Sequence, residues 1–273
     1  MASLGVTRGV LATTAGLALA SVALQYPVSI AEGERGFVFE TVEYFSYFTI
    51  VSNLVLALGA GLLALDPTRR GPWLAALRLG GLIMITVTGA VFHLFLAGEE
   101  LTGLGYYTDL GLHTVVPVVA VLGWLVVGPH RLFRWSILLR AVLLPVLWLV
   151  YAMVRGAVVG EALYPFMDVA VLGATQVALT LAAITLFALL LGAVYIAGDR
   201  WLPASAFATD ASEPDEAIAA QRSDATRQLA RSLLTGRLRQ QKNHQGQSAQ
   251  HHQQPHEVDE SHLGRSHPSV DRH

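Results

Sequence analysis

Cysteine is absent from this 273-residue sequence, and charged residues make up only 14% of it. Without cysteine, the chain forms no disulfide, no thiolate metal site and no cysteine nucleophile. Lysine occurs once, as Lys242, and the formal net charge is −2 at pH 7. A nearly neutral net charge gives no excess of positive charge to attract nucleic acid, so the composition predicts no nucleic-acid partner.

Polar residues are scarce before Pro203 and abundant after it. Long apolar runs with short charged interruptions fill residues 1–202, whereas residues 203–273 are rich in Gln, His, Arg and Asp. A soluble domain needs more polar surface than residues 1–202 supply. We therefore predict a transmembrane domain over residues 1–202 and a cytoplasmic tail over residues 203–273.

Several apolar runs are long enough to cross a bilayer, which takes about 20 residues in a helix. Their continuous apolar character favours helices over the alternating pattern of a β-barrel. The first run also contains small residues typical of a signal-peptide cleavage site, and its removal would leave five spans. The prediction is an all-α membrane protein, a bundle of six transmembrane helices, at about 9–26, 44–65, 74–97, 111–127, 136–156 and 168–197.

Arginine is distributed unevenly between the predicted loops. If the N-terminus is cytoplasmic, most arginines fall on the cytoplasmic side, and only Arg35 and Arg155 fall on the other. Because positive residues mark cytoplasmic loops, we predict that both termini are cytoplasmic. The composition, rich in Gly, Ala, Val, Leu and Arg, indicates a bacterial source and hence a multi-pass protein of the cell membrane.

The tail divides into two segments. The segment 213–241 starts with acidic residues and ends with basic residues. Its apolar face would be formed by Ile218, Leu229, Leu233 and Leu234. This arrangement is typical of one amphipathic helix. The remaining Gln- and His-rich segment is predicted to be disordered, and its histidines, lacking fixed geometry, predict no metal site.

Polar residues of the predicted spans gather at one depth. Thr49 and Asn53 lie one turn apart near the outer end of the second span, while the inner halves are almost purely apolar. Intramembrane ionisable groups usually face the bundle interior or a wet cavity. We therefore predict one polar pocket toward the outer side. Its expected members are Thr49, Asn53, His93, Asp109, His113, Tyr151, Arg155 and Asp168.

Each member also has a purely structural interpretation. A threonine in a membrane helix usually bonds to a carbonyl of its own helix, and Asn53 is equally suited to joining two helices. Arg155 and Asp168 could each anchor a helix end at the membrane interface, or they could form an ion pair with one another. His113 is the stronger candidate for chemistry, because Asp109 stands one turn before it and would orient the imidazole as a base.

A hydroxyl nucleophile needs a base within hydrogen-bond distance, and the base needs an orienting group. Thr49, His113 and Asp109 are of these types, while Asn53 and Arg155 are of the types that stabilise an oxyanion. The sequence contains no GxSxG elbow, no HExxH motif and no glycine-rich phosphate loop. From the residues alone, a Thr/His hydrolase is one interpretation among several.

Three stretches carry a family resemblance: YFTIVSNLVLALG, GLHTVVPVVAV and LWLVYAMVRGAVVGEALYPFMDV. They resemble the androgen-induced-gene (FAR-17a-type) family of multi-span membrane proteins and its bacterial relatives, over most of residues 40–197. The resemblance implies a threonine hydrolase of fatty acid esters of hydroxy fatty acids, with Thr49 as nucleophile and His113 as its partner. It implies a lipid substrate from the membrane and no cofactor.

Three other functions stay open. A non-catalytic lipid-binding protein would have the same pocket. A haem protein would use His93 and His113 as axial ligands, although the inner halves lack the further histidines of multi-haem proteins. A transporter would need polar groups through the membrane or two related halves with broken helices. We expect the lipid-ester hydrolase ahead of these.

Overall fold

The structure is a computed structural model that describes residues 3–96, 98, 102–203 and 223–228. All regular structure in these residues is helical, and six helices are long and apolar enough to cross a membrane. The prediction of an all-α bundle with six apolar helices is therefore confirmed. The six are Leu4–Glu32, Phe48–Leu65, Pro72–Leu96, Gly103–Val127, Trp135–Val159 and Ala174–Trp201.

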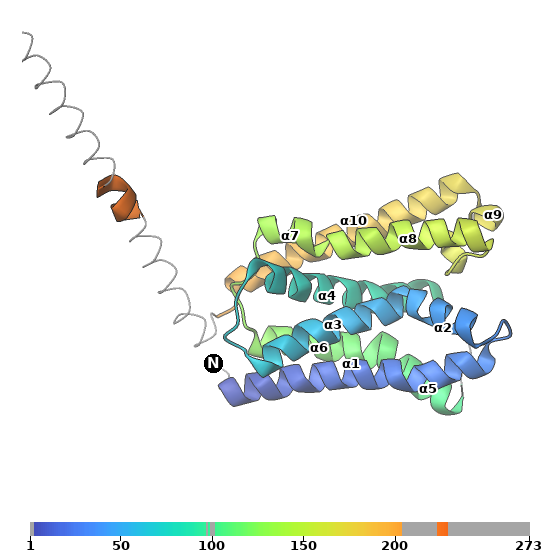
Figure 1. The fold of residues 1–273 in the computed structure, drawn as a ribbon, viewed down its shortest axis with the longest axis horizontal. Coiled ribbons are helices and arrows are strands. Elements are labelled where there is room, and N and C mark those ends of the chain that lie inside the picture. Colours follow the sequence, from blue (N-terminus) through green and yellow to red (C-terminus); the bar gives the residue numbers. More distant parts are fainter. Residues whose placement is uncertain (1–2, 97, 99–101, 204–222, 229–273) are drawn as a thin grey trace, which may run out of the picture. The chain divides into compact units, whose positions relative to one another are not determined.

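These spans are assembled from shorter elements (Figure 1). Two of them contain a π-helical turn, and each of these turns carries a histidine of the predicted pocket. In chain order the elements are α1 (Leu4–Glu32), α2 (Phe37–Ser46), α3 (Phe48–Leu65), α4 (Pro72–Val91), η1 (Phe92–Leu96), α5 (Gly103–Leu110), η2 (Gly111–Val115), α6 (Val116–Val127), α7 (Trp135–Ala141), α8 (Leu143–Val159), η3 (Pro165–Met167), α9 (Val169–Leu172) and α10 (Ala174–Trp201).

The predicted span 44–65 is divided by a break in the helix. α2 ends at Ser46, Tyr47 is extended with φ −64° and ψ 135°, and α3 begins at Phe48. Neither proline nor glycine occurs at this point, so local sequence preference alone does not predict the break. Its consequence is a new helix N-terminus beside Thr49.

α4 is the most buried of the six spans and packs against α3, α6, α7 and α10 (Figure 1). Glycine makes this packing close. A Cβ added at Gly80 would lie 2.9 Å from the Ala141 carbonyl oxygen, and one at Gly81 would lie 3.2 Å from the Leu56 Cα. Small residues allow this close approach of membrane helices, so α4 forms the centre of the bundle.

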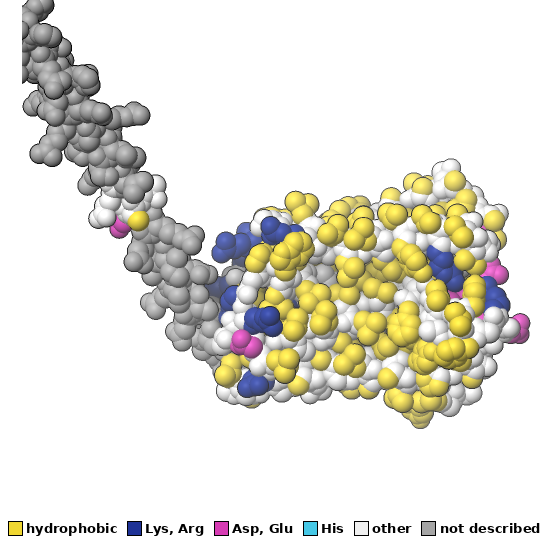
Figure 2. Space-filling model, in the orientation of Figure 1, with side chains coloured by type: hydrophobic (Ala, Val, Ile, Leu, Met, Phe, Trp, Pro, Cys, Tyr) yellow, Lys and Arg dark blue, Asp and Glu magenta, His cyan; other side chains and the backbone are white. Residues whose placement is uncertain are grey.

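The surface of the bundle is largely hydrocarbon. Leu179, Leu186, Leu190 and Val194 on α10 are all more than half exposed. On the face drawn in Figure 2, hydrophobic side chains cover the middle of the bundle, and charged side chains gather toward its two ends. A soluble monomer rarely exposes so much contiguous apolar surface, whereas lipid contact stabilises it.

The bundle has two ends, a proximal end and a distal end. The proximal end carries Ser3 and Pro203, and the distal end carries residues 33–36 between α1 and α2. In the tail, residues 223–228 are helical and exposed. The rest of the predicted amphipathic helix 213–241, and the segment predicted to be disordered, lie outside the described residues.

Candidate active site

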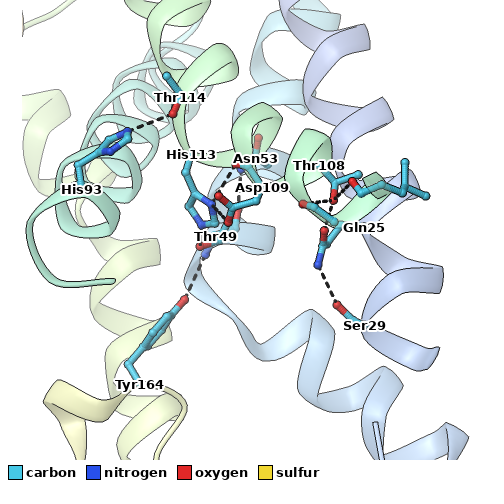
Figure 3. A network of polar contacts seen from close by, with 12 residues as sticks. Gln25, Ser29, Thr49, Asn53, His93, Thr108, Asp109, His113, Thr114 and Tyr164 are labelled. Carbon is cyan, nitrogen blue, oxygen red and sulfur yellow. Dashed lines mark hydrogen bonds and ion pairs between the residues drawn. The ribbon is translucent and has the colours of Figure 1, made fainter. Parts of the chain in front are cut away.

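The hydroxyl of Thr49 contacts an imidazole from another span. Thr49 Oγ1 lies 3.2 Å from His113 Nε2 (Figure 3). Thr49 is in the first turn of α3, and His113 is in η2. Other span threonines, namely Thr14, Thr86 and Thr185, place their hydroxyls on a carbonyl of their own helix. Thr49 thus differs from these three threonines in that its hydroxyl contacts an imidazole of another span.

A carboxylate orients the same imidazole. Asp109 Oδ1 lies 2.9 Å from His113 Nδ1, and the Asp109 backbone carbonyl lies 3.2 Å from that nitrogen. Nδ1–H therefore donates to Asp109, which leaves the lone pair on Nε2 to accept the Thr49 proton. The Thr49 hydroxyl, the His113 imidazole and the Asp109 carboxylate are thus connected by successive hydrogen bonds. The His113 side chain is only 13% exposed.

The π-helical turn and a close helix contact position His113. Pro117 has no N–H, so the His113 carbonyl lacks its usual partner four residues on. A Cβ added at Gly89 of α4 would lie 3.1 Å from this carbonyl oxygen, which shows how closely α4 approaches. Single π turns within α-helices are frequent at functional sites. The local backbone of η2 is thus held against α4.

Phe92 fixes the plane of the imidazole. Its ring stacks on the His113 ring with centroids 4.0 Å apart and an interplanar angle of 9°. Offset aromatic stacking is favourable in such pairs, and here it covers one face of the base. Sequence reasoning selected the adjacent His93 and missed Phe92, because an aromatic residue in an apolar span carries no distinguishing signal.

Asn53 lies one turn below Thr49, as predicted, but bonds to the backbone. Its Nδ2 donates to the Thr49 carbonyl at 2.8 Å, and Ser52 Oγ donates to the same oxygen at 2.9 Å. Ser52 Oγ also lies 2.8 Å from Thr88 Oγ1 on α4. These bonds fix the Thr49 peptide, so the structure gives Asn53 a positioning contact in place of the expected oxyanion contact.

Three other predicted members make separate contacts. His93 Nε2 lies 3.0 Å from Thr114 Oγ1, and Figure 3 shows it away from Thr49. Tyr151 places its hydroxyl 2.6 Å from Ser46 Oγ. Asp168 caps the N-terminus of α9 through its side chain. The structure therefore places these three outside the Thr49 cluster.

The arrangement of the histidines disfavours the haem alternative. Axial ligation needs two imidazoles that offer free nitrogens to one central metal. Both ring nitrogens of His113 are occupied by Thr49 and Asp109, and His93 contacts Thr114. Within the described residues, no group of three or more His, Cys, Asp or Glu is arranged to hold a metal ion.

Arg155 belongs to an ion-pair cluster at the distal end. Its Nη2 lies 3.2 Å from Glu43 Oε2, and Arg35 Nη2 lies 2.7 Å from the same oxygen. Arg35 also pairs with Glu161, and both guanidinium groups lie over the Phe39 ring. The cluster joins α2 and the α1–α2 loop to α8 and the loop after it. The expectation that Arg155 stabilises an oxyanion at Thr49 is not met by this geometry.

Tyr164 lies over the backbone of Thr49. Its hydroxyl oxygen is 3.5 Å from the Thr49 backbone nitrogen (Figure 3), and its ring packs against Tyr47, Trp148 and Phe166. Burial raises the pKa of the Tyr164 phenol, so this hydroxyl keeps its proton at neutral pH. Tyr164 precedes η3 in an irregular segment, where helical periodicity gives no signal, and sequence reasoning did not select it.

A cavity of about 340 Å³ borders Thr49, His113 and Tyr164. It lies between α4, α8 and α10, and its lining on α4 and η1 runs from Ile83 to Leu96, roughly 20 Å at 1.5 Å per residue. The volume falls within the range of small-molecule sites. Away from the polar end the lining is almost entirely hydrocarbon, so the cavity suits an apolar chain.

The chain was compared with family models, with curated proteins and with solved structures, and none of them matches it. The contacts and the cavity described above are therefore the structural basis for the function proposed below.

Removal of the shared carboxylate in the distal cluster is expected to destabilise the bundle. Glu43→Gln should lower the free energy of unfolding by about 3 kcal/mol, because it leaves the buried Arg155 without its ion pair. Denaturant unfolding of the detergent-solubilised protein measures this loss. Glu161→Gln is the matched control with a smaller expected loss, since its side chain is 62% exposed. Equal losses in the two variants would contradict the prediction.

Proposed function

We propose that this protein is an integral-membrane lipid-ester hydrolase with Thr49 as nucleophile and His113 as general base. The observation that carries the proposal is the chain of contacts at one end of the apolar cavity. Thr49 Oγ1 lies 3.2 Å from His113 Nε2, and His113 Nδ1 lies 2.9 Å from Asp109 Oδ1. Nucleophile, base and orienting carboxylate at these distances are the set that activates a hydroxyl.

The acylation step follows from these contacts. Thr49 Oγ1 attacks the ester carbonyl carbon while its proton moves to His113 Nε2, and the π electrons of the carbonyl move to its oxygen. The tetrahedral intermediate then reforms the carbonyl and breaks the ester C–O bond. The departing alkoxide takes the proton from His113 and leaves as the alcohol. Asp109 stabilises the transient imidazolium.

Deacylation repeats the sequence with water. A water molecule attacks the acyl-threonine carbonyl and gives its proton to His113 Nε2. Collapse of the second intermediate breaks the bond to Thr49 Oγ1, which takes the proton back from His113. The products are a free carboxylic acid and the regenerated threonine, and no cofactor is required.

The substrate class proposed is a long-chain lipid ester, such as a fatty acid ester of a hydroxy fatty acid. A cavity of about 340 Å³ that is apolar except at the Thr49 end fits an acyl chain whose ester group remains at the polar end. The family resemblance supports the same substrate class. A lipid-binding protein without catalysis would use the same cavity, and turnover by the purified protein distinguishes the two.

The proposed location is a bacterial cell membrane, with both termini cytoplasmic. This orientation follows the arginine distribution and places the distal end, with Thr49 and His113, in the outer half. Arginines near the proximal end are Arg8, Arg69, Arg70, Arg131, Arg134 and Arg200, and acidic residues near the distal end are Glu32, Glu34, Glu40, Glu43 and Glu161.

Active-site labelling tests the nucleophile. A fluorophosphonate probe should modify the wild-type protein at Thr49, and Thr49→Ala should lose both the label and ester hydrolysis. Asp109→Asn should lower kcat by at least about 100-fold, because it no longer holds the reactive tautomer of His113. Thr185→Ala, which removes another hydroxyl lining the same cavity, is the control with unchanged labelling. If the wild-type protein shows neither labelling nor ester turnover, the proposal is wrong.

Filling the cavity tests where the acyl chain lies. Ala188 lines the cavity on α10, away from Thr49, so Ala188→Phe should shorten the space available to a chain. The ratio of kcat/KM for a long over a short acyl ester should fall at least about tenfold, because one or more methylene groups lose their site. Ala182→Phe, an exposed position on the same helix, should leave the ratio unchanged. An unaltered ratio in both variants would place the chain elsewhere.

The absence of cysteine makes the orientation directly measurable. Glu34→Cys in the α1–α2 loop should react with a membrane-impermeant maleimide in intact cells, while Arg69→Cys in the α3–α4 loop should react only after permeabilisation. Both positions are exposed, so access to the reagent depends on the membrane alone. The opposite pattern would reverse the proposed topology.

A further inference from the structure

The N-terminus of α3 is open. Tyr47 is its N-cap residue, and the Tyr47 side chain makes no capping hydrogen bond. The first N–H groups of an α-helix have no carbonyl partner within the helix, and Thr49 is the second residue of α3. These groups also carry the positive partial charge of the helix dipole. The Thr49 hydroxyl therefore lies beside N–H donors that have no carbonyl partner within their own helix.

The hydroxyl of Tyr164 faces the same helix end. Its oxygen lies 3.5 Å from the Thr49 nitrogen and accepts from that N–H, and Phe48 precedes Thr49 as the first residue of α3. This distance is long for an N–H···O bond, so the helix end is only weakly satisfied. The Tyr164 ring is held by stacking on Phe166 with centroids 5.2 Å apart and by an edge contact with Tyr47. The Tyr164 oxygen thus accepts weakly from the helix end, and its own O–H proton remains available to donate to another acceptor.

We propose that the Tyr164 hydroxyl and the backbone N–H groups of Phe48 and Thr49 form the oxyanion-binding site of the hydrolysis. This inference rests on the hydrolase function proposed above and adds Tyr164 as a further catalytic residue. In Figure 3, His113 and Tyr164 approach Thr49 from different sides. The threonine proton therefore leaves toward His113, while the carbonyl oxygen turns toward Tyr164 and the helix end.

The charges developed in each step are balanced within the site. When Thr49 Oγ1 bonds to the carbonyl carbon, one electron pair moves to the carbonyl oxygen and one proton moves to His113 Nε2. The oxygen, now negative, accepts hydrogen bonds from Tyr164 and the two N–H groups. Because these donors are fixed before the reaction and lie beside an apolar cavity, they need no reorganisation. When the intermediate collapses, the electron pair on the oxygen re-forms the carbonyl double bond. The hydrogen bonds from Tyr164 and the two N–H groups to this oxygen then weaken.

The oxyanion role gives Tyr164→Phe a specific kinetic signature. The kcat of the variant should fall about 10²- to 10³-fold. Its KM should change less than about threefold, since the hydrogen bond from Tyr164 strengthens only in the transition state. The pH dependence of kcat should match that of the wild type. Phe retains the ring contacts with Phe166 and Tyr47, and a melting curve verifies the fold. Tyr195→Phe removes a buried hydroxyl that contacts Thr86, and it should retain wild-type kinetics.

A binding measurement separates this inference from the hydrolase proposal. The affinity of Tyr164→Phe for a trifluoromethyl ketone, which forms an oxyanion with the nucleophile, should fall by the same factor as kcat/KM. Its affinity for a non-hydrolysable ether analogue should not change. A wild type that hydrolyses esters through Thr49, with Tyr164→Phe equally active, would overturn the oxyanion assignment and leave the hydrolase intact. A wild type without turnover or labelling would overturn both.

Discussion

The extended backbone at Tyr47 is the constraint on which the site depends. It ends α2 and starts α3 in a half-buried part of the chain, so the first N–H groups of α3 have no carbonyl partner within the helix. N–H groups that leave water need a hydrogen-bond partner, and here the Thr49 N–H donates to the Tyr164 hydroxyl oxygen at 3.5 Å. Tyr164 lies over this helix end, and the pair between Arg155 and Glu43 joins α8 to α2 nearby. The break is therefore maintained by tertiary contacts and not by local preference.

The polar chemistry is confined to one end of an apolar space. Thr49, His113 and Tyr164 meet at that end of the cavity, and hydrocarbon side chains line the remainder. A low local dielectric strengthens the bonds from His113 to Thr49 and Asp109. It also holds an apolar chain away from water. The proposed hydrolase would use the apolar part of this cavity to bind the lipid chain and the polar end to activate the Thr49 hydroxyl.

Part of the site was accessible to sequence reasoning, and part was not. Asp109 and His113 are four residues apart, and this helical spacing brings their side chains together. Depth along the spans placed Thr49 at the level of His113. The same argument placed Arg155 and His93 in the pocket, yet they contact Glu43 and Thr114. Depth is a one-dimensional quantity, and the direction in which a side chain leaves its helix depends on rotation about the helix axis.

The sequence by itself determined the six apolar helices, because a bilayer core requires each spanning segment to satisfy its own backbone hydrogen bonds. It also determined which residue types lie near each helix end. Only the tertiary structure decided that Thr49 meets His113, that Phe92 covers the imidazole and that Tyr164 lies over the α3 N-terminus. These contacts join segments far apart in the chain. They depend on helix rotation, on the π-helical turns and on the close packing of α4, which are set by the whole bundle and by no local stretch of sequence.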